Sequence, residues 1–216
     1  MAGAYRWALI GALVIILGVG PFVCFRASYA HAKRLREVVP GRFYRCGQLT
    51  AEGFAEVQQR FGIKTVLNVQ DDYPDPDVAR SFWDWRTVKE HELCERLGMR
   101  YVVIAPDLVP RHQVPEQRPA AVDQFLALMD DESNYPVLIH CRAGLHRTGV
   151  LTAVYRMEYQ GWSPAAAYRE LKAHGFGPFA CTSANDYVRQ YVLTYRPGLR
   201  RAAGTVQARA TTPDGP

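Results

Sequence analysis

A cysteine and an arginine separated by five residues mark the stretch of this chain with the clearest chemistry. Cys141 follows an apolar run, Val137 to Ile139, which predicts a short buried strand, and Arg147 precedes an apolar, helix-compatible segment, Val150 to Tyr159. A tight loop between a strand and a helix turns backbone N–H groups toward one point, and the helix end adds its positive dipole. The pattern predicts a binding site for a dianion such as a phosphate group.

The residue types in this loop suit phosphoryl transfer to sulfur. The planar guanidinium of Arg147 matches two phosphate oxygens, and positive surroundings favour thiolate over thiol at Cys141. Gly144 and Gly149 permit backbone angles and close approaches that a side chain would block. A thiolate beneath a bound phosphate is placed to attack phosphorus. The alternative is a buried structural cysteine beside a surface arginine, which requires all these features to coincide.

His140-Cys141-x5-Arg147-Thr148 resembles the signature loop of the cysteine-dependent protein tyrosine and dual-specificity phosphatases. Tyr44-Arg-Cys-Gly-Gln48 is similar to the Tyr-Arg-Ser-Gly-Gln opening of the atypical dual-specificity phosphatases of bacteria, fungi and plants, with Cys46 in place of the serine. Cys46 is expected to be a buried thiol, and a disulfide with Cys141 under oxidation is the alternative.

The resemblance implies a hydrolase that passes through a phosphocysteine. Cys141 is then the nucleophile, Asp107 protonates the leaving oxygen and later activates water, and the Thr148 hydroxyl hydrogen-bonds the sulfur. His140 orients the loop from beneath. No metal or other cofactor is implied. The residues expected to bind the substrate phosphate are Arg142, Ala143, Gly144, Leu145, His146 and Arg147.

The general acid is assigned by its position in the chain. Asp107 follows a predicted strand, Arg100 to Ala105, and lies 34 residues before the cysteine, in a Pro-Asp-x-x-Pro setting that resembles the acid loop of the family. Asp71 and Asp72, in an acidic turn-rich loop, are the alternatives. Asp123 falls in a helical pattern and is expected at the surface.

The inner residues of the loop bear on the substrate. The fungal inositol-pyrophosphate phosphatases resemble His-Cys-Lys-x-Gly-Lys-His-Arg, whereas this chain keeps His146 but has Leu145 in place of the second lysine. We therefore predict a phosphotyrosine or dual-specificity protein substrate, with a phosphoinositide or inositol (pyro)phosphate as the alternative. A sulfurtransferase would need neither Asp107 nor Thr148. A non-catalytic phosphate-binding module would have lost the cysteine, the arginine or the acid.

Composition describes a globular chain with basic ends. Of its 216 residues 48% are hydrophobic and 22% charged, and five widely spaced cysteines form no Cys-x-x-Cys pair. That usage argues against a disulfide framework or a zinc site and for a reducing compartment. The net charge of +5 arises at the ends, since Glu37 to Tyr195 holds 17 basic and 20 acidic residues. We therefore expect no nucleic-acid partner.

The N-terminal region contains a candidate membrane anchor. Ala8 to Phe25 is 18 residues without a charge, and as a helix it would rise roughly 27 Å, close to the hydrocarbon thickness of a bilayer. Four basic residues between Arg26 and Arg36 follow it, so the positive-inside rule places the catalytic domain in the cytoplasm of a single-pass protein. Export after signal cleavage at Ser28-x-Ala30 is the alternative.

Three segments are predicted: residues 1–36 as membrane anchor and basic linker, 37–196 as the phosphatase domain, and 197–216 as a disordered tail. Strands alternate with helices in the second segment, which predicts an α/β fold with a central sheet of about four to five strands flanked by helices. Phe43 to Arg45 is expected as an edge strand, and Trp83 and Trp85 in the core. Oligomeric state has no signal in the sequence.

Overall fold

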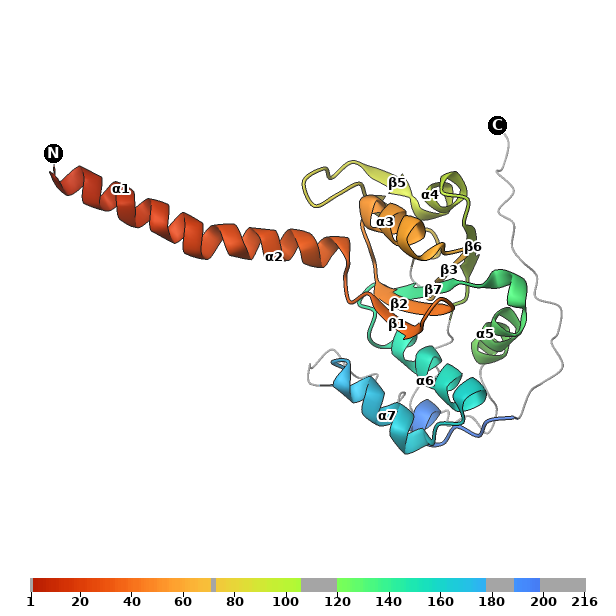
Figure 1. The fold of residues 1–216 in the computed structure, drawn as a ribbon. Helices are drawn as coiled ribbons and strands as arrows, with labels where there is room; N and C mark the ends of the chain where they lie inside the picture. Colours follow the sequence, from red (N-terminus) through yellow and green to blue (C-terminus); the bar gives the residue numbers. More distant parts are fainter. Residues whose placement is uncertain (1, 71–72, 106–119, 178–188, 199–216) are drawn as a thin grey trace.

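A five-stranded sheet forms the centre of the computed structural model, which describes residues 2–70, 73–105, 120–177 and 189–198 (Figure 1). The strand order is β1-β2-β7-β3-β6. β1 runs antiparallel to β2, and the other neighbours are parallel. The strands are Arg36–Val39 (β1), Phe43–Gly47 (β2), Thr65–Asn68 (β3), Arg100–Val103 (β6) and Val137–Cys141 (β7). This architecture confirms the predicted α/β fold.

Helices cover both faces of the sheet, so its central strands are buried on both sides. Every residue of β2, β3 and β7 is buried. Figure 1 shows α3 and α4 on one side of the sheet and α5, α6 and α7 on the other. The helices are Ala51–Phe61 (α3), Glu90–Arg96 (α4), Ala120–Asp130 (α5), Arg147–Gln160 (α6) and Pro164–Ala173 (α7), with short helical segments at Glu132–Asn134 (η2) and Arg189–Leu193 (η3).

Local signals set the ends of two helices as predicted. The Thr50 hydroxyl accepts a hydrogen bond from the Gly53 amide at 3.1 Å, and Gly62, with a φ of 62°, ends α3. The Ser163 hydroxyl accepts from the Ala166 amide at 3.3 Å before α7, whose first residue is a proline.

The N-terminal region forms a rod that projects away from the sheet (Figure 1). It consists of Ala2–Val14 (α1), a π-helical turn at Ile15–Val19 (η1) and Gly20–His31 (α2). Tyr5–His31 is long and apolar enough to cross a membrane, with a mean hydropathy of 2.6 over its most apolar window, none of which is buried in the described structure. A signal sequence near the N-terminus can have the same length and composition.

Residues 36–39, where the expected linker meets the expected phosphatase domain, form a strand. β1 begins at Arg36, and Val38 is buried against the sheet. β1 is therefore the edge of the sheet, and the prediction of an edge strand at Phe43 to Arg45 is wrong, because β2 lies between β1 and β7. Alternation in Arg-Glu-Val-Val is too short to be distinguished from a linker by pattern alone.

The prediction that the tryptophans pack in the core is also wrong. Asp77–Ala79 (β4) and Thr87–Lys89 (β5) form a separate antiparallel hairpin, and Trp83 and Trp85 lie at its tip with 72% and 82% of their surface exposed. The Ser81 hydroxyl accepts from the Asp84 amide at 3.0 Å, which closes the turn. Each strand of this hairpin has only three residues, and the turn that carries the two tryptophans does not pack against the core.

Candidate active site

The predicted signature loop joins β7 to α6. Cys141 is the last residue of β7 and is 3% exposed, and the Gly144 amide donates a hydrogen bond to its sulfur at 3.2 Å. Gly144 has a φ of 70°, and a Cβ there would lie 2.5 Å from the Cys46 oxygen and from the Gly47 nitrogen. Only glycine fits this close approach of the loop to the end of β2.

Three consecutive carbonyl groups of the loop, those of residues 142 to 144, accept hydrogen bonds from cations outside it. The donors are, in order, Lys33 Nζ at 2.7 Å, Arg34 Nη1 at 2.8 Å and Arg45 Nη2 at 2.8 Å. The carbonyl and the following N–H of a peptide plane point in opposite directions. The amides of residues 143 to 145 therefore face away from these cations, and that of Gly144 points to the sulfur. Amides turned inward in this way are what an anion nest requires.

Arg45 supports the loop from within the protein. Its side chain is almost fully buried, and burial lowers its pKa to about 10, so the guanidinium keeps its charge at neutral pH. β2 places Arg45 beside Ile139 of β7, on the face of the sheet that carries Cys141. No local pattern in the sequence indicates a role for this arginine.

The start of α6 directs further donors to the same place. The first amide of the helix to bond within it is that of Val150, which donates to the His146 carbonyl at 2.8 Å. The amides of residues 147 to 149 precede it and have no acceptor within the helix. Arg147 begins the helix, half-buried, and its first turn contains no acidic residue. Backbone dipole and guanidinium thus reinforce each other at this helix end.

His140 lies on the opposite face of β7, beneath the loop, in a network of buried polar side chains. Its Nε2 is 2.6 Å from Glu90 Oε1, and both side chains are fully buried. Glu90 Oε2 accepts from Gln48 Nε2 at 2.8 Å, and Gln48 Oε1 accepts from Gln70 Nε2 at 2.7 Å. The ring of Phe54 packs edge-on against His140 at 5.7 Å between centroids. Glu90 and the two glutamines were missed because they are 50 or more positions from Cys141 in the chain.

Three other predicted residues are placed as follows. Thr148 is buried, and among the described residues its Oγ1 has no hydrogen-bond partner, so the expected bond to sulfur is not formed here. Leu145 is buried as well. Burial, followed by the charges of Arg147 and Arg34, lowers the pKa of His146, whose ring packs edge-on against Phe176 at 5.4 Å. His146 is therefore neutral at pH 7.

The predicted general acid, Asp107, and both alternatives, Asp71 and Asp72, lie outside the described residues. Asp123 lies in the first turn of α5, in the helix expected for it. Arg142 is exposed and Ala143 partly exposed at the mouth of the loop. Among the residues that the structure describes, no cluster of histidine, cysteine and carboxylate side chains could hold a metal ion.

Cys46 occupies a different environment from Cys141. It pairs in register with His140, so its side chain faces α3 and α4, whereas Cys141 belongs to the cluster on the other face. Burial, with the charge of Glu90, raises the pKa of the Cys46 thiol well above its usual value. A protonated thiol on the far side of the sheet is a poor partner for a disulfide.

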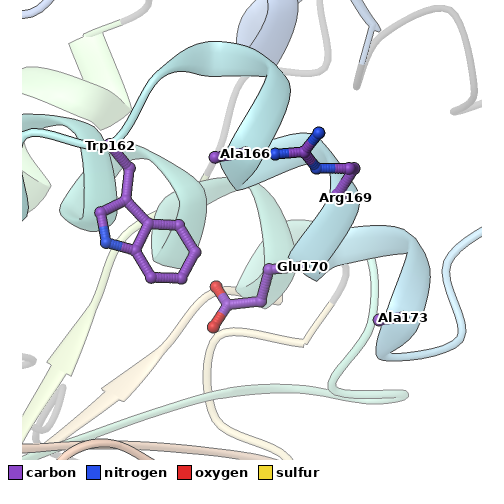
Figure 2. A pocket seen from close by; sticks show the side chains of 5 residues that line it. All are labelled: Trp162, Ala166, Arg169, Glu170 and Ala173. Atoms are coloured by element: carbon purple, nitrogen blue, oxygen red, sulfur yellow. The ribbon is translucent and has the colours of Figure 1, made fainter.

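A groove of about 550 Å³ lies along α7, lined by Trp162, Ala166, Arg169, Glu170 and Ala173 (Figure 2). Glu170 accepts from Arg156 of α6 at 2.6 Å, and the same guanidinium lies 4.6 Å from the Trp162 ring centre. None of the lining residues belongs to the predicted site. Its polar groups serve to join α6 to α7.

A model of the family described as a DSP-PTPase phosphatase fused to NAD+ kinase matches residues 26–189. The chain belongs to this family. Its members are cysteine-based phosphatases of the tyrosine and dual-specificity kind, which confirms the resemblance read from the signature loop. The matched range begins within α2 and includes the whole of the sheet.

Curated relatives match parts of the chain. It is 48% identical over 46 residues to the dual specificity protein phosphatase TpbA of Pseudomonas aeruginosa, which is 21% of each chain. It is 25% identical over 165 residues to the inositol diphosphatase SIW14 of Saccharomyces cerevisiae, which is 72% of this chain and 53% of that protein. The alignments thus span between a fifth and about half of these relatives.

Solved structures share the fold. The catalytic core of Siw14 superposes with a TM-score of 0.57 at 20% identity, covering 77% of this chain and 86% of that one. The crystal structure of TpbA from P. aeruginosa superposes with a TM-score of 0.50 at 26% identity, covering 76% of this chain and 89% of that one. Both likenesses cover about three quarters of this chain rather than a local motif.

Proposed function

We propose that this protein hydrolyses phosphate monoesters through a phosphocysteine at Cys141, on phosphotyrosine or dual-specificity protein substrates. The observation that carries the proposal is the loop itself. Its nucleophile receives a backbone hydrogen bond, and its amides are turned toward the same space by outward-facing carbonyls. Donors arranged in advance around a developing negative charge stabilise a transition state without reorganising.

The reaction has two steps. The Cys141 thiolate attacks phosphorus in line, the sulfur–phosphorus bond forms as the ester oxygen–phosphorus bond breaks, and Asp107 gives the leaving oxygen its proton. Water then attacks the phosphocysteine and loses a proton to Asp107, which releases phosphate and the thiolate. Arg147 and the loop amides hold the three remaining phosphate oxygens in both steps.

The character of the loop supports a protein substrate. Leu145 is buried and His146 is neutral, so these two positions add no charge for a multiply phosphorylated ligand. The relative TpbA is a dual specificity protein phosphatase. The second candidate, an inositol (pyro)phosphate or phosphoinositide, is supported by the alignment with the inositol diphosphatase SIW14 over 165 residues.

The deciding assay measures phosphate release by the full chain from a phosphotyrosine peptide, a phosphoinositide and an inositol pyrophosphate. We expect activity that is abolished by Cys141→Ser and strongly reduced by Asp107→Ala. Cys24→Ser, which removes an exposed thiol from α2, is the matched control and should leave the rate unchanged. Activity that survives Cys141→Ser would overturn the proposal, and the preferred substrate separates the two candidates.

We place the enzyme in a membrane through a single N-terminal span, with its catalytic domain in the cytoplasm. The apolar helix Tyr5–His31 and the basic residues that follow it support this location. An alkaline carbonate wash should leave the full chain in the membrane pellet, with its N-terminal residues intact by mass spectrometry. Release into the supernatant, or cleavage after Ala30, would instead support export.

A further inference from the structure

The chain between the N-terminal helix and the sheet is folded onto the catalytic loop. This basic strap, residues 31–35, connects α2 to β1. Lys33 Nζ donates to the Arg142 carbonyl at 2.7 Å, and Arg34 Nη1 donates to the Ala143 carbonyl at 2.8 Å. The main chain takes part as well, because the carbonyl of Lys33 accepts from the Gly47 amide at 2.7 Å. Two side chains and one peptide group thus join the strap to the loop and to the end of β2.

Two glycines make room for the strap. A Cβ at Gly47 would lie 2.8 Å from the Lys33 Cδ and 3.1 Å from the Ala143 oxygen, and a Cβ at Gly53 of α3 would overlap the His31 carbonyl. His31 Nε2 also lies 2.6 Å from Glu56 Oε2 of α3. The C-terminal end of α2 is therefore held against α3, and the strap starts from a defined point.

The backbone of the strap is strained at Arg34, whose φ is 53°. A side chain rarely adopts this left-handed conformation unless surrounding contacts compensate for its cost. Here the conformation brings the guanidinium to the loop carbonyl, and the Tyr29 ring lies 5.5 Å below it. The pKa of Lys33 is lowered overall, mainly by burial and then by the neighbouring charge of Arg34. The charge of Cys141 offsets part of this effect.

We propose that Lys33 and Arg34 are positioning residues for the phosphate-binding loop. By holding the carbonyls of Arg142 and Ala143 outward, they keep the amides of Ala143 and Gly144 directed at the bound phosphate. The Gly144 amide points to the sulfur, as this requires. The catalytic unit therefore begins at the end of α2, upstream of the boundary at residue 37. The inference rests on the proposed function for the identity of the bound anion.

The test compares Lys33→Met, Arg34→Met and the double variant with Arg26→Met, in the full chain held in nanodiscs. Arg26 is an exposed residue of α2, so its replacement removes the same charge from the same region. Tungstate, an oxyanion that is not hydrolysed, is titrated by calorimetry, and kcat and KM are measured on a phosphotyrosine peptide. We expect tungstate affinity and kcat/KM to fall about tenfold in the double variant, from the loss of charge-assisted hydrogen bonds. Arg26→Met should match wild type.

Two further variants separate positioning from support of the fold. Arg34→Gly removes the donor but relieves the positive φ, so it should weaken tungstate binding while the thermal midpoint stays the same or rises. Lys33→Arg keeps a cationic donor and should restore most of the binding lost in Lys33→Met. Unchanged tungstate affinity in the folded double variant or in Arg34→Gly would overturn the inference, as would an equal loss in Arg26→Met.

The outcomes also separate this inference from the proposed function. A wild-type chain that binds tungstate but releases no phosphate from any ester would contradict the function, and the ratio of tungstate affinities would still test the strap. An active wild type with an equally active double variant would contradict the strap alone. A wild-type chain that binds no tungstate would contradict both.

Discussion

On one face of the sheet, here the open face, Cys141 ends β7 and its sulfur accepts a hydrogen bond from the Gly144 amide. On the other face, here the closed face, His140 lies one residue earlier, fully buried and 2.6 Å from Glu90, which accepts a hydrogen bond from Gln48. The alternation of side chains along a strand separates the two environments by a single position. Cys46 is a second cysteine near the carboxyl ends of the strands, but it lies on the closed face, beside His140. The face of the sheet, rather than the residue type, decides the surroundings of each cysteine.

The largest expected effect tests the open face. Cys141→Ser replaces the thiolate by a hydroxyl that is hardly ionised at neutral pH, so the rate should fall by about 10³-fold or more. Tungstate affinity should change much less, since the loop amides and Arg147 remain. Single-turnover phosphate release and calorimetry measure the two quantities. A rate within tenfold of wild type would show that the open face does not supply the nucleophile.

A substitution on the closed face should mainly lower the free energy of unfolding. Glu90→Leu leaves His140 buried without its partner, and removing one member of a buried pair costs about 3–5 kcal/mol. Urea unfolding monitored by circular dichroism measures the free energy of unfolding. Glu92→Leu, at an exposed position of the same helix, is the control and should stay within about 0.5 kcal/mol of wild type. Equal effects of the two changes would contradict a stabilising His140–Glu90 pair beneath the loop.

The two cysteines should also differ in their response to pH. Burial raises the pKa of Cys46 in the folded protein, so the unfolded chain loses this proton first as the pH rises. The contribution of Cys46 to stability is complete below the unfolded thiol pKa of about 8.5 and should be lost above it, by about 2 kcal/mol at pH 10. Urea titrations at pH 7 and 10 should show this loss in wild type, and a loss smaller by that amount in Cys46→Ala.

The smallest expected effect on stability concerns Thr148, whose proposed role is in the second step of the reaction, the breakdown of the phosphocysteine. Its buried hydroxyl has no partner among the described residues, so the isosteric change Thr148→Val should alter the free energy of unfolding by about 0.5 kcal/mol or less. If the hydroxyl bonds to sulfur when the thiolate leaves, breakdown of the phosphocysteine should slow by about tenfold. Pre-steady-state kinetics measure the rate of this breakdown, and the variant should show a burst of the first product followed by slow turnover. Unchanged breakdown would remove the role predicted for Thr148.

Signals within a few neighbouring residues determined the parts of this protein that could be predicted. The spacing of Cys141 and Arg147 predicts the strand, loop and helix that the structure contains, and Thr50 and Ser163 mark the helix starts. Capping, turn formation and hydrophobic periodicity act over one or two turns of chain, so they can be read directly from the sequence.

The tertiary structure alone decided which distant residues complete the site. Lys33 and Arg34 reach the loop across 109 positions of sequence, and Glu90 reaches His140 through the packing of α4 on the sheet. Nothing local distinguishes these charges from solvated surface charges such as Arg26 or Glu92. Strand pairing brings Lys33 and Arg34 to the loop, because β1 runs antiparallel to β2 and therefore begins beside the carboxyl ends of β2 and β7.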